Sequence, residues 1–194
     1  MDSQHIFIEM EQMAVLRRFQ KSLNTLTGLS FDFLDIHARH APVLRAAKAF
    51  TPFCHLVHKT PSGHNACEAC TCNLIQQCLK KNRVVIGTCH LGLVDVYIPM
   101  TIHGSVIGFF STGQFLLHSP TRSQFAGIRS KLAQLGVDIE QANKAYFNLM
   151  VFSRKKLAAV INLIHILVDT IAAEESKLQA IHEAAKKDPI LQAR

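Results

Sequence analysis

Two runs of alternating apolar residues, joined by a short turn, constrain the fold of this chain more than any other feature. Val94–Ile102 and residues 106–113 alternate with the period of two that is typical of half-buried strands. The intervening His103-Gly104-Ser105 contains the glycine that a tight turn between antiparallel strands favours. The pattern therefore predicts an antiparallel hairpin at the centre of the chain.

Further strands and several helices are predicted on both sides of this hairpin. Residues 29–33 alternate in the same way, and residues 84–88 have the composition of a short buried strand. Apolar residues at three- and four-residue steps predict helices over 9–27, 66–82, 119–135, 138–150 and 153–185. Local pattern and turn chemistry predict a short helix over 42–50, an extended piece over 52–57 and a loop over 61–65. This order predicts an α+β fold, with helices flanking a central antiparallel sheet and a long helix near the C-terminus.

The composition indicates a folded protein and argues against several classes of function. Apolar residues make up 48% of the 194 residues and charged residues 18%, as in globular domains. The net charge of +7 is spread along the chain, and its densest run is only Arg154-Lys155-Lys156, so no nucleic-acid-binding face is predicted within it. No apolar run approaches the roughly 18 residues of a membrane span, and no secretory signal is recognisable. We therefore expect a cytoplasmic protein without a membrane partner.

All six cysteines lie in one central stretch of the sequence, between Cys54 and Cys89. In a reducing compartment such a cluster favours metal binding or thiol reactivity over a disulfide framework. Cys67 and Cys70, one helical turn apart, with Cys54 and Cys89 from neighbouring elements, could hold zinc or an iron–sulfur cluster. His90 is the substitute ligand should one thiolate not reach. Two alternatives stay open: redox-active thiols that form a disulfide, and buried cysteines that only pack.

Several short motifs resemble the PocR sensory domain. They are Cys89-His90-Leu91-Gly92-Leu93-Val94-Asp95, Ile98-Pro99, Ile107-Gly108, Thr112-Gly113-Gln114, and upstream Pro52-Phe53-Cys54 with Cys67-Glu68-Ala69-Cys70. The resemblance covers roughly residues 23–171. It implies a variant of the PAS/GAF sensor fold with a small-molecule pocket between sheet and helices. Members of this family precede signalling or DNA-binding modules, and the namesake is associated with sensing small diols.

The same resemblance divides the chain and implies partners. An N-terminal helix over 1–28 precedes a sensory core over 29–152, and residues 153–194 carry the last helix and a linker. Residues 188–194 resemble the lead-in to an AraC-type DNA-binding domain. The implied partners are a small-molecule effector and, only through a downstream domain outside this chain, DNA.

Six residues form the predicted ligand-binding set. Asp95 and Gln114 are polar where the strand pattern expects apolar residues, and buried polar groups need partners that a small polar ligand would supply. His90, inside the family motif, could donate to a ligand hydroxyl. The set is Phe53, Cys89, His90, Asp95, Tyr97 and Gln114. The structural alternatives are that His90 is a core residue, that Asp95 caps a turn and that Gln114 pairs with the sheet edge.

Catalysis is the less favoured class of function. Cys89 and His90 are adjacent, and adjacent residues on a strand point to opposite faces, so this pair is poorly placed for thiol activation. The sequence contains no carboxylate pair, phosphate loop or dinucleotide motif. We therefore expect a sensor and not an enzyme.

The last helix carries a heptad-like apolar seam. It consists of Leu157, Ile161, Ile164, Val168, Ile171 and Leu178. At roughly 1.5 Å per residue the helix is longer than one small domain needs, so its second half should project beyond the core. We expect a homodimer in which Ile164, Val168, Ile171 and Leu178 contact the same helix of a second subunit. The alternative is a core helix with a polar tail.

Overall fold

The computed structural model describes residues 14–37, 51–102 and 104–187. The helices within these ranges are α2 (Ala14–Thr27), α3 (Pro52–His58), α4 (Pro61–Lys81), α5 (Arg122–Gln134), α6 (Ile139–Phe147) and α7 (Arg154–Lys187). The strands are β1 (Ser30–Asp35), β2 (Val85–Thr88), β3 (Val94–Ile102) and β4 (Ser105–Phe115). The predicted short helix over 42–50, the start of the first helix before residue 14, and the lead-in at 188–194 lie outside the described residues.

The four strands form one antiparallel sheet in the order β1-β4-β3-β2. The predicted hairpin is confirmed as β3 and β4, and Gly104 at the turn has a φ of +77°, which a residue with a Cβ rarely adopts. The predicted strands at 29–33 and 84–88 become β1 and β2 at the two edges. The predicted α+β class, with helices flanking an antiparallel sheet, is therefore confirmed.

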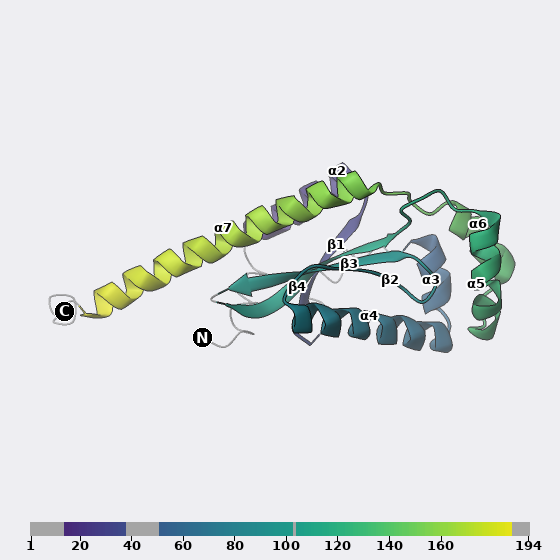
Figure 1. The fold of residues 1–194 in the computed structure, drawn as a ribbon, viewed down its shortest axis with the longest axis horizontal. Helices are drawn as coiled ribbons and strands as arrows, with labels where there is room; N and C mark the ends of the chain where they lie inside the picture. Colours follow the sequence, from purple (N-terminus) through teal and green to yellow (C-terminus); the bar gives the residue numbers. More distant parts are fainter. Residues whose placement is uncertain (1–13, 38–50, 103, 188–194) are drawn as a thin grey trace.

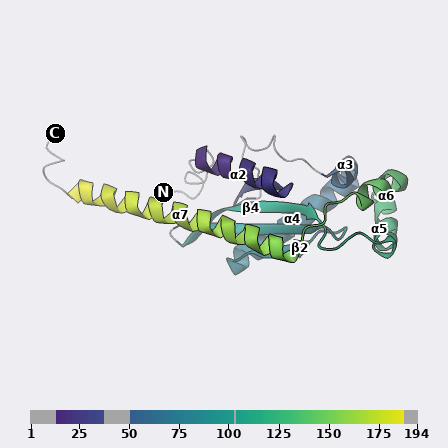
Figure 2. The ribbon, with the colours of Figure 1, turned by 90° about the horizontal axis from the view of Figure 1, so that it is seen from above.

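Helices cover both faces of the sheet, as Figures 1 and 2 show. α2 and α7 lie on one face and α4 on the other, while α3, α5 and α6 gather at one end. The face under α2 and α7 forms the largest core, to which β3 contributes Val94, Val96, Ile98, Met100 and Ile102. Phe33 and Phe110, on neighbouring strands, contact each other there with ring centroids 4.0 Å apart and ring planes tilted by 56°. Burial of this apolar surface is the main source of stability.

Two Thr-Pro pairs start the helices that carry most of the cysteines. Thr51 and Thr60 each accept a hydrogen bond at the side-chain oxygen from a backbone N–H three residues on, and the following proline occupies the first helical position. Threonine N-caps and proline at this position both favour helix initiation. The predicted extended piece over 52–57 and the predicted loop over 61–65 are therefore wrong: both segments are helical.

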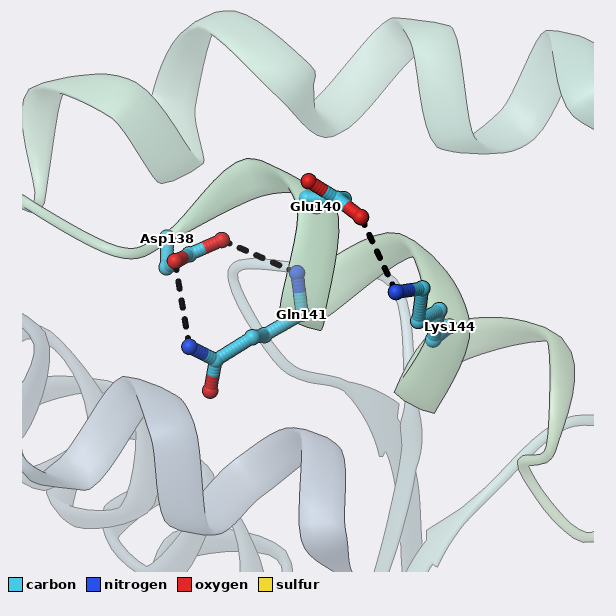
Figure 3. Close-up of polar contacts among 4 residues, drawn as sticks. All are labelled: Asp138, Glu140, Gln141 and Lys144. Atoms are coloured by element: carbon cyan, nitrogen blue, oxygen red, sulfur yellow. Dashed lines mark hydrogen bonds and ion pairs between the residues drawn. The ribbon is translucent and has the colours of Figure 1, made fainter.

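The helices at the end of the sheet also begin at caps. Thr121 and Gln124 form a reciprocal capping box at α5, so this helix starts at Arg122 and not at the predicted Ser119-Pro120. At α6, Asp138 accepts hydrogen bonds from the backbone N–H and the side-chain amide of Gln141 (Figure 3). One turn further on, Lys144 pairs with Glu140 at 2.9 Å.

The apolar seam of α7 packs into the core of its own chain. Ile164, Val168 and Ile171 are at most 7% exposed and lie against the strands and α2. The prediction that these three side chains contact a second subunit is therefore wrong, because the sheet already covers them. The prediction that the second half of this helix projects beyond the core is confirmed, because α7 extends past the end of the sheet (Figure 1).

One stretch of the described residues is long and apolar enough, by length and composition alone, to cross a membrane. It is Arg154–Glu174 in α7, with a mean hydropathy of 1.7, and 28% of it is buried. Core helices of soluble proteins pass the same test, and this helix buries Leu157, Val160 and Ile164 against the sheet. A single such helix is weak evidence for a membrane span.

Candidate functional site

Polar residues concentrate on the face of the sheet that α4 covers. Because side chains alternate along a strand, Asp95 and Tyr97 of β3 point to the face opposite Val94 and Val96. In the register, one row across this face reads Gly87, Asp95, Gly113 and Ser30, and the next reads Val85, Tyr97, Ser111 and Asp32. We call Ser30, Asp32, Asp95, Tyr97 and Ser111 the polar lane. It brings together side chains from three strands.

Glycines flank Asp95 on both neighbouring strands and make room for its carboxylate. A Cβ on Gly113 would lie 2.2 Å from Oδ1 of Asp95, and one on Gly87 would lie 2.3 Å from a methyl carbon of Leu74 in α4. Any larger residue would push against Asp95 or against the packing of α4 on β2. The absence of side chains at both positions therefore shapes this end of the polar lane.

Gln114 sits in an irregularity of the β3–β4 pairing. The register shifts between Val94 and Asp95, and Gln114 takes a left-handed backbone conformation with a φ of +67°. Bulges next to binding sites re-aim side chains, and a strained non-glycine residue is a common marker of function. Gln114, Asp32, Asp95 and Ser111 line a niche of about 30 Å³, which is room for about one water or one hydroxyl group.

Four cysteines surround the same end of the sheet. Cys54 in α3, Cys67 in α4 and Cys89 after β2 pack against the apolar cluster that α5 and α6 complete, and Cys70 borders the cluster under α4. The charge of Asp95 acts on the thiols of Cys54, Cys70 and Cys89. Cys78 is fully buried, and its thiol can donate its one proton to the carbonyl oxygen of Arg83 at 3.2 Å or of Tyr97 at 3.5 Å, while Cys72 is exposed. For Cys78 the packing interpretation fits.

Burial keeps most of these groups in their neutral form. Desolvation raises the pKa of Cys54 and of Cys89 to about 12, and in each the negative charge of Asp95 adds to the shift. Desolvation also raises the pKa of Tyr97, with Asp95 adding to it and a hydrogen bond with Thr71 opposing it. Burial, helped by the Lys131 ammonium, lowers the pKa of His90. At neutral pH the site therefore contains protonated thiols, a phenol and a neutral imidazole.

His90 contacts a different cysteine from the one beside it in sequence. It lies in the turn after β2, not on a strand, and its Nε2 is 3.2 Å from Sγ of Cys67. Its Nδ1 is buried and has no hydrogen-bond partner among the described residues. Sequence reasoning missed this thiol–imidazole pair because 23 residues separate the two positions. The Cys89–His90 argument against thiol activation therefore does not apply to Cys67.

The predicted metal ligands lie near one another without forming a coordination shell. Among the described residues, no group of three or more His, Cys, Asp and Glu side chains is placed so that it could hold a metal ion. We derive no chemistry through a metal from this arrangement. Binding of zinc or an iron–sulfur cluster by Cys54, Cys67, Cys70 and Cys89 stays a prediction, and metal analysis of anaerobically purified protein would test it.

Phe53, the remaining residue of the predicted ligand-binding set, does not line the niche. Phe53 is fully buried and meets Tyr146 edge-on, with ring centroids 5.4 Å apart, so it supports the cysteine-bearing helices from within the core.

A larger open groove of about 550 Å³ runs between β2 and α7, with mainly apolar walls. The sequence did not point to this groove, which shares no residue with the polar lane.

The fold and this site define a class: an α+β domain whose sheet has one apolar face and one face that combines a small apolar cluster with polar residues and neighbouring cysteines. A family model described as the sensory domain found in PocR matches residues 9–176, and the chain belongs to that family. It is 29% identical over 103 residues to the regulatory protein PocR of Salmonella typhimurium, which covers 53% of this chain and 33% of that protein. The chain thus matches about a third of the length of this relative. No solved structure matches it.

Proposed function

We propose that this chain is the effector-binding domain of a transcriptional regulator and that its effector is a small hydroxylated molecule such as a diol. The observation that carries the proposal is the polar lane, in which Asp95, Tyr97 and Ser111 face α4 inside an otherwise apolar sandwich. Asp95 and Ser111 are half-buried and Tyr97 is buried, and their oxygens are groups to which effector hydroxyls can hydrogen-bond. Membership of a sensory family supports the proposal.

In this proposal an effector hydroxyl enters the niche between Asp95 and Gln114. An ionised carboxylate only accepts hydrogen bonds, so Asp95 would accept from the hydroxyl, while the amide of Gln114 can both donate and accept. The orphaned Nδ1 of His90 offers one more polar atom at the thiol-rimmed end. Such a site discriminates hydroxylated ligands from apolar ones of the same size, because only a hydroxylated ligand can hydrogen-bond to these oxygens and amides.

The proposal also covers how effector binding is transmitted out of the domain and which partners the regulator has. Binding under α4 would be transmitted through α7, the helix that leads out of the domain (Figure 1). We propose that it acts in the cytoplasm as a homodimer, that DNA is bound only through a downstream domain, and that the domain catalyses no reaction. The name of the Salmonella relative, a regulatory protein, supports the regulatory role.

Calorimetry with a panel of small diols tests the effector proposal. The unmodified protein should bind at least one diol, and Asp95→Asn should weaken binding by about tenfold or more, equal to about 1.4 kcal/mol. The matched control is Asp169→Asn, which changes an exposed carboxylate on α7, on the opposite side of the sheet. Equal affinities of the two variants, or no diol binding at all, would contradict the proposal.

The gathered thiols favour one second candidate, a redox-sensing domain. Cys54, Cys67 and Cys89 all pack against the same apolar cluster. Oxidation of such neighbours to a disulfide would shift the helices that carry them. Mass spectrometry after mild peroxide treatment tests this candidate. Loss of two hydrogen atoms from a pair among Cys54, Cys67 and Cys89, with two electrons passing to the peroxide and the loss reversed by a thiol reductant, supports redox sensing, and unchanged thiols argue against it.

A further inference from the structure

The groove between β2 and α7 lies where the helices stop covering the apolar face of the sheet. Ile86 pairs with Val96 across β2 and β3, so both side chains point to that face. Val96 is fully buried, whereas Ile86 on the edge strand is 52% exposed. The groove has a volume of about 550 Å³, and small-molecule pockets measure roughly 300–1,000 Å³. The domain therefore has an apolar recess of ligand size on the side of the sheet opposite the polar lane.

Both walls of this groove are largely apolar. The apolar lining residues are Val84, Ile86, Leu117, Leu157, Ala158 and Ile161. The three that come from α7 share one face of the helix, because they are spaced within one turn of each other. Ala158 is exposed, and its methyl group is the smallest side chain of this lining. Displacement of water from such walls favours the binding of aliphatic carbons.

The polar residues of the groove all come from α7 and make one end of it positive. They are Arg154, Asn162 and His165. None of the described residues that line the groove is acidic, and the guanidinium of Arg154 stays protonated at any ordinary pH. Arg154 is also the first residue of α7, whose first turn contains no acidic residue and whose helix dipole adds positive potential there. This end of the groove is therefore complementary to a carboxylate.

The spacing along α7 limits the length of the ligand. Arg154 and Asn162, at the two ends of the apolar wall, are separated by about 12 Å along the helix axis. Asn162 is polar and exposed, so a chain that reaches past it leaves the apolar walls. A carboxylate with an aliphatic chain of medium length fits this distance.

We propose that this groove binds a free medium-chain carboxylic acid in its ionised form. Arg154 holds the carboxylate, and the aliphatic chain lies along the apolar walls. Such a ligand contacts β2 and α7 at once, so it fastens the edge strand to the helix that leads out of the domain. The groove shares no residue with the niche of the polar lane. The inference therefore goes beyond the proposed effector site and does not depend on it.

Calorimetry with octanoate, used below its micellar concentration, tests the proposal on the whole chain. Octanoate should bind about tenfold more tightly than 1-octanol, because only the carboxylate pairs with the guanidinium. It should also bind about tenfold more tightly than hexanoate, which lacks two of its methylene groups. Arg154→Gln should weaken octanoate binding by about tenfold and leave octanol binding unchanged. Lys155→Gln is the matched control, because it removes the same charge from a neighbouring residue that does not line the groove.

A second pair of variants assigns the binding to the groove. Ala158→Leu fills the groove with a larger side chain and should abolish the binding of both octanoate and octanol. Ala159→Leu makes the same change at the next residue, which is exposed and outside the groove, and should preserve both affinities. Leucine and alanine are both strong helix formers, so α7 should stay intact in the two variants.

Several results would overturn the inference. They are the absence of octanoate binding, equal affinities for octanoate and octanol, and equal octanoate affinities of the two leucine variants. Sedimentation velocity adds another: a dimer that Ala158→Leu dissociates and octanoate does not would mean that a second copy covers the groove. Binding to anionic vesicles that Ala158→Leu abolishes, without octanoate binding, would mean that a membrane surface covers it. Diol calorimetry reports on the opposite face of the sheet, so failure of octanoate to bind leaves the effector proposal standing.

Discussion

On the face of the sheet that α2 and α7 cover, β3 presents only apolar side chains, whereas on the face that α4 covers it presents Asp95, Tyr97 and Pro99. The two faces share one backbone and differ only in the alternate residues. The first face buries phenylalanines and aliphatic residues from three strands and two helices. The second combines a small apolar cluster around Cys78 and Phe109 with the polar lane beside it.

This difference indicates a division of labour between stability and binding. Apolar burial on the first face supplies the driving force for folding, so the second face can retain carboxylates, a strained residue and glycines. Gln114 in its left-handed conformation is of no evident use for packing. Variants on the two faces should therefore differ in whether they lower stability or lower affinity.

The largest expected effect is a loss of stability on the α7 face. Ile164 is fully buried, so Ile164→Ala should lower the free energy of unfolding by about 2–5 kcal/mol through lost burial and a residual cavity. Urea unfolding measures it. Ile166, two residues on and 55% exposed, is the matched control, and its change to alanine should cost within about 0.5 kcal/mol. Equal losses in the two variants would mean that α7 is not packed as described.

A second variant tests whether glycine shapes the polar lane. Gly113→Ala would place its methyl group 2.2 Å from Asp95 and 2.8 Å from the Val94 carbonyl. Overpacking of this kind should cost about 1–3 kcal/mol and should also weaken effector binding in calorimetry. Gly127→Ala in α5 meets nothing within 4 Å and should instead stabilise by about 0.5–1 kcal/mol. Full stability and affinity in Gly113→Ala would show that the close approach is unimportant.

The sequence predicted the first face better than the second. Alternation and helical spacing depend on local pattern, and they identified the hairpin, both edge strands and the long helices. The errors at 52–57 and 61–65 arose because local pattern and turn chemistry predicted an extended segment and a loop, although Thr51-Pro52 and Thr60-Pro61 are helix-start signals. The same local pattern could have identified both helices.

The candidate site was only partly predictable because it depends on pairings between distant residues. Asp95 and Gln114 stood out as polar residues in strands, and the structure places both in one niche. Asp32 joins them from β1 through the strand register, which no single segment encodes. The Cys67–His90 contact depends in the same way on how α4 lies across the sheet. The seam of α7 showed that one face was apolar, but not whether the sheet or a second subunit covers it.

Removal of the Thr60 cap, on the α4 side of the sheet, should lower the free energy of unfolding by an intermediate amount. Thr60→Ala removes the oxygen that accepts from the Gly63 N–H at 3.1 Å and should cost about 1 kcal/mol in urea unfolding. Thr170→Ala on the exposed side of α7 is the control, with an expected change within about 0.5 kcal/mol. Equal losses of stability in the two variants would mean that the Thr60 hydroxyl does not cap α4.

The smallest expected effect concerns pH and the imidazole on the α4 side. Burial, and to a lesser degree Lys131, lower the folded-state pKa of His90 from its ordinary value near 6.5. As the pH falls through this value the unfolded chain binds a proton that the folded chain resists, so stability should decrease below about pH 6.5. His90→Gln should flatten this decrease in urea unfolding followed from about pH 7.5 to 5.5. Lys131→Met removes only the smaller cause and should flatten it less. A slope that is identical in all three proteins would mean that His90 is as free to protonate in the folded chain as in the unfolded one.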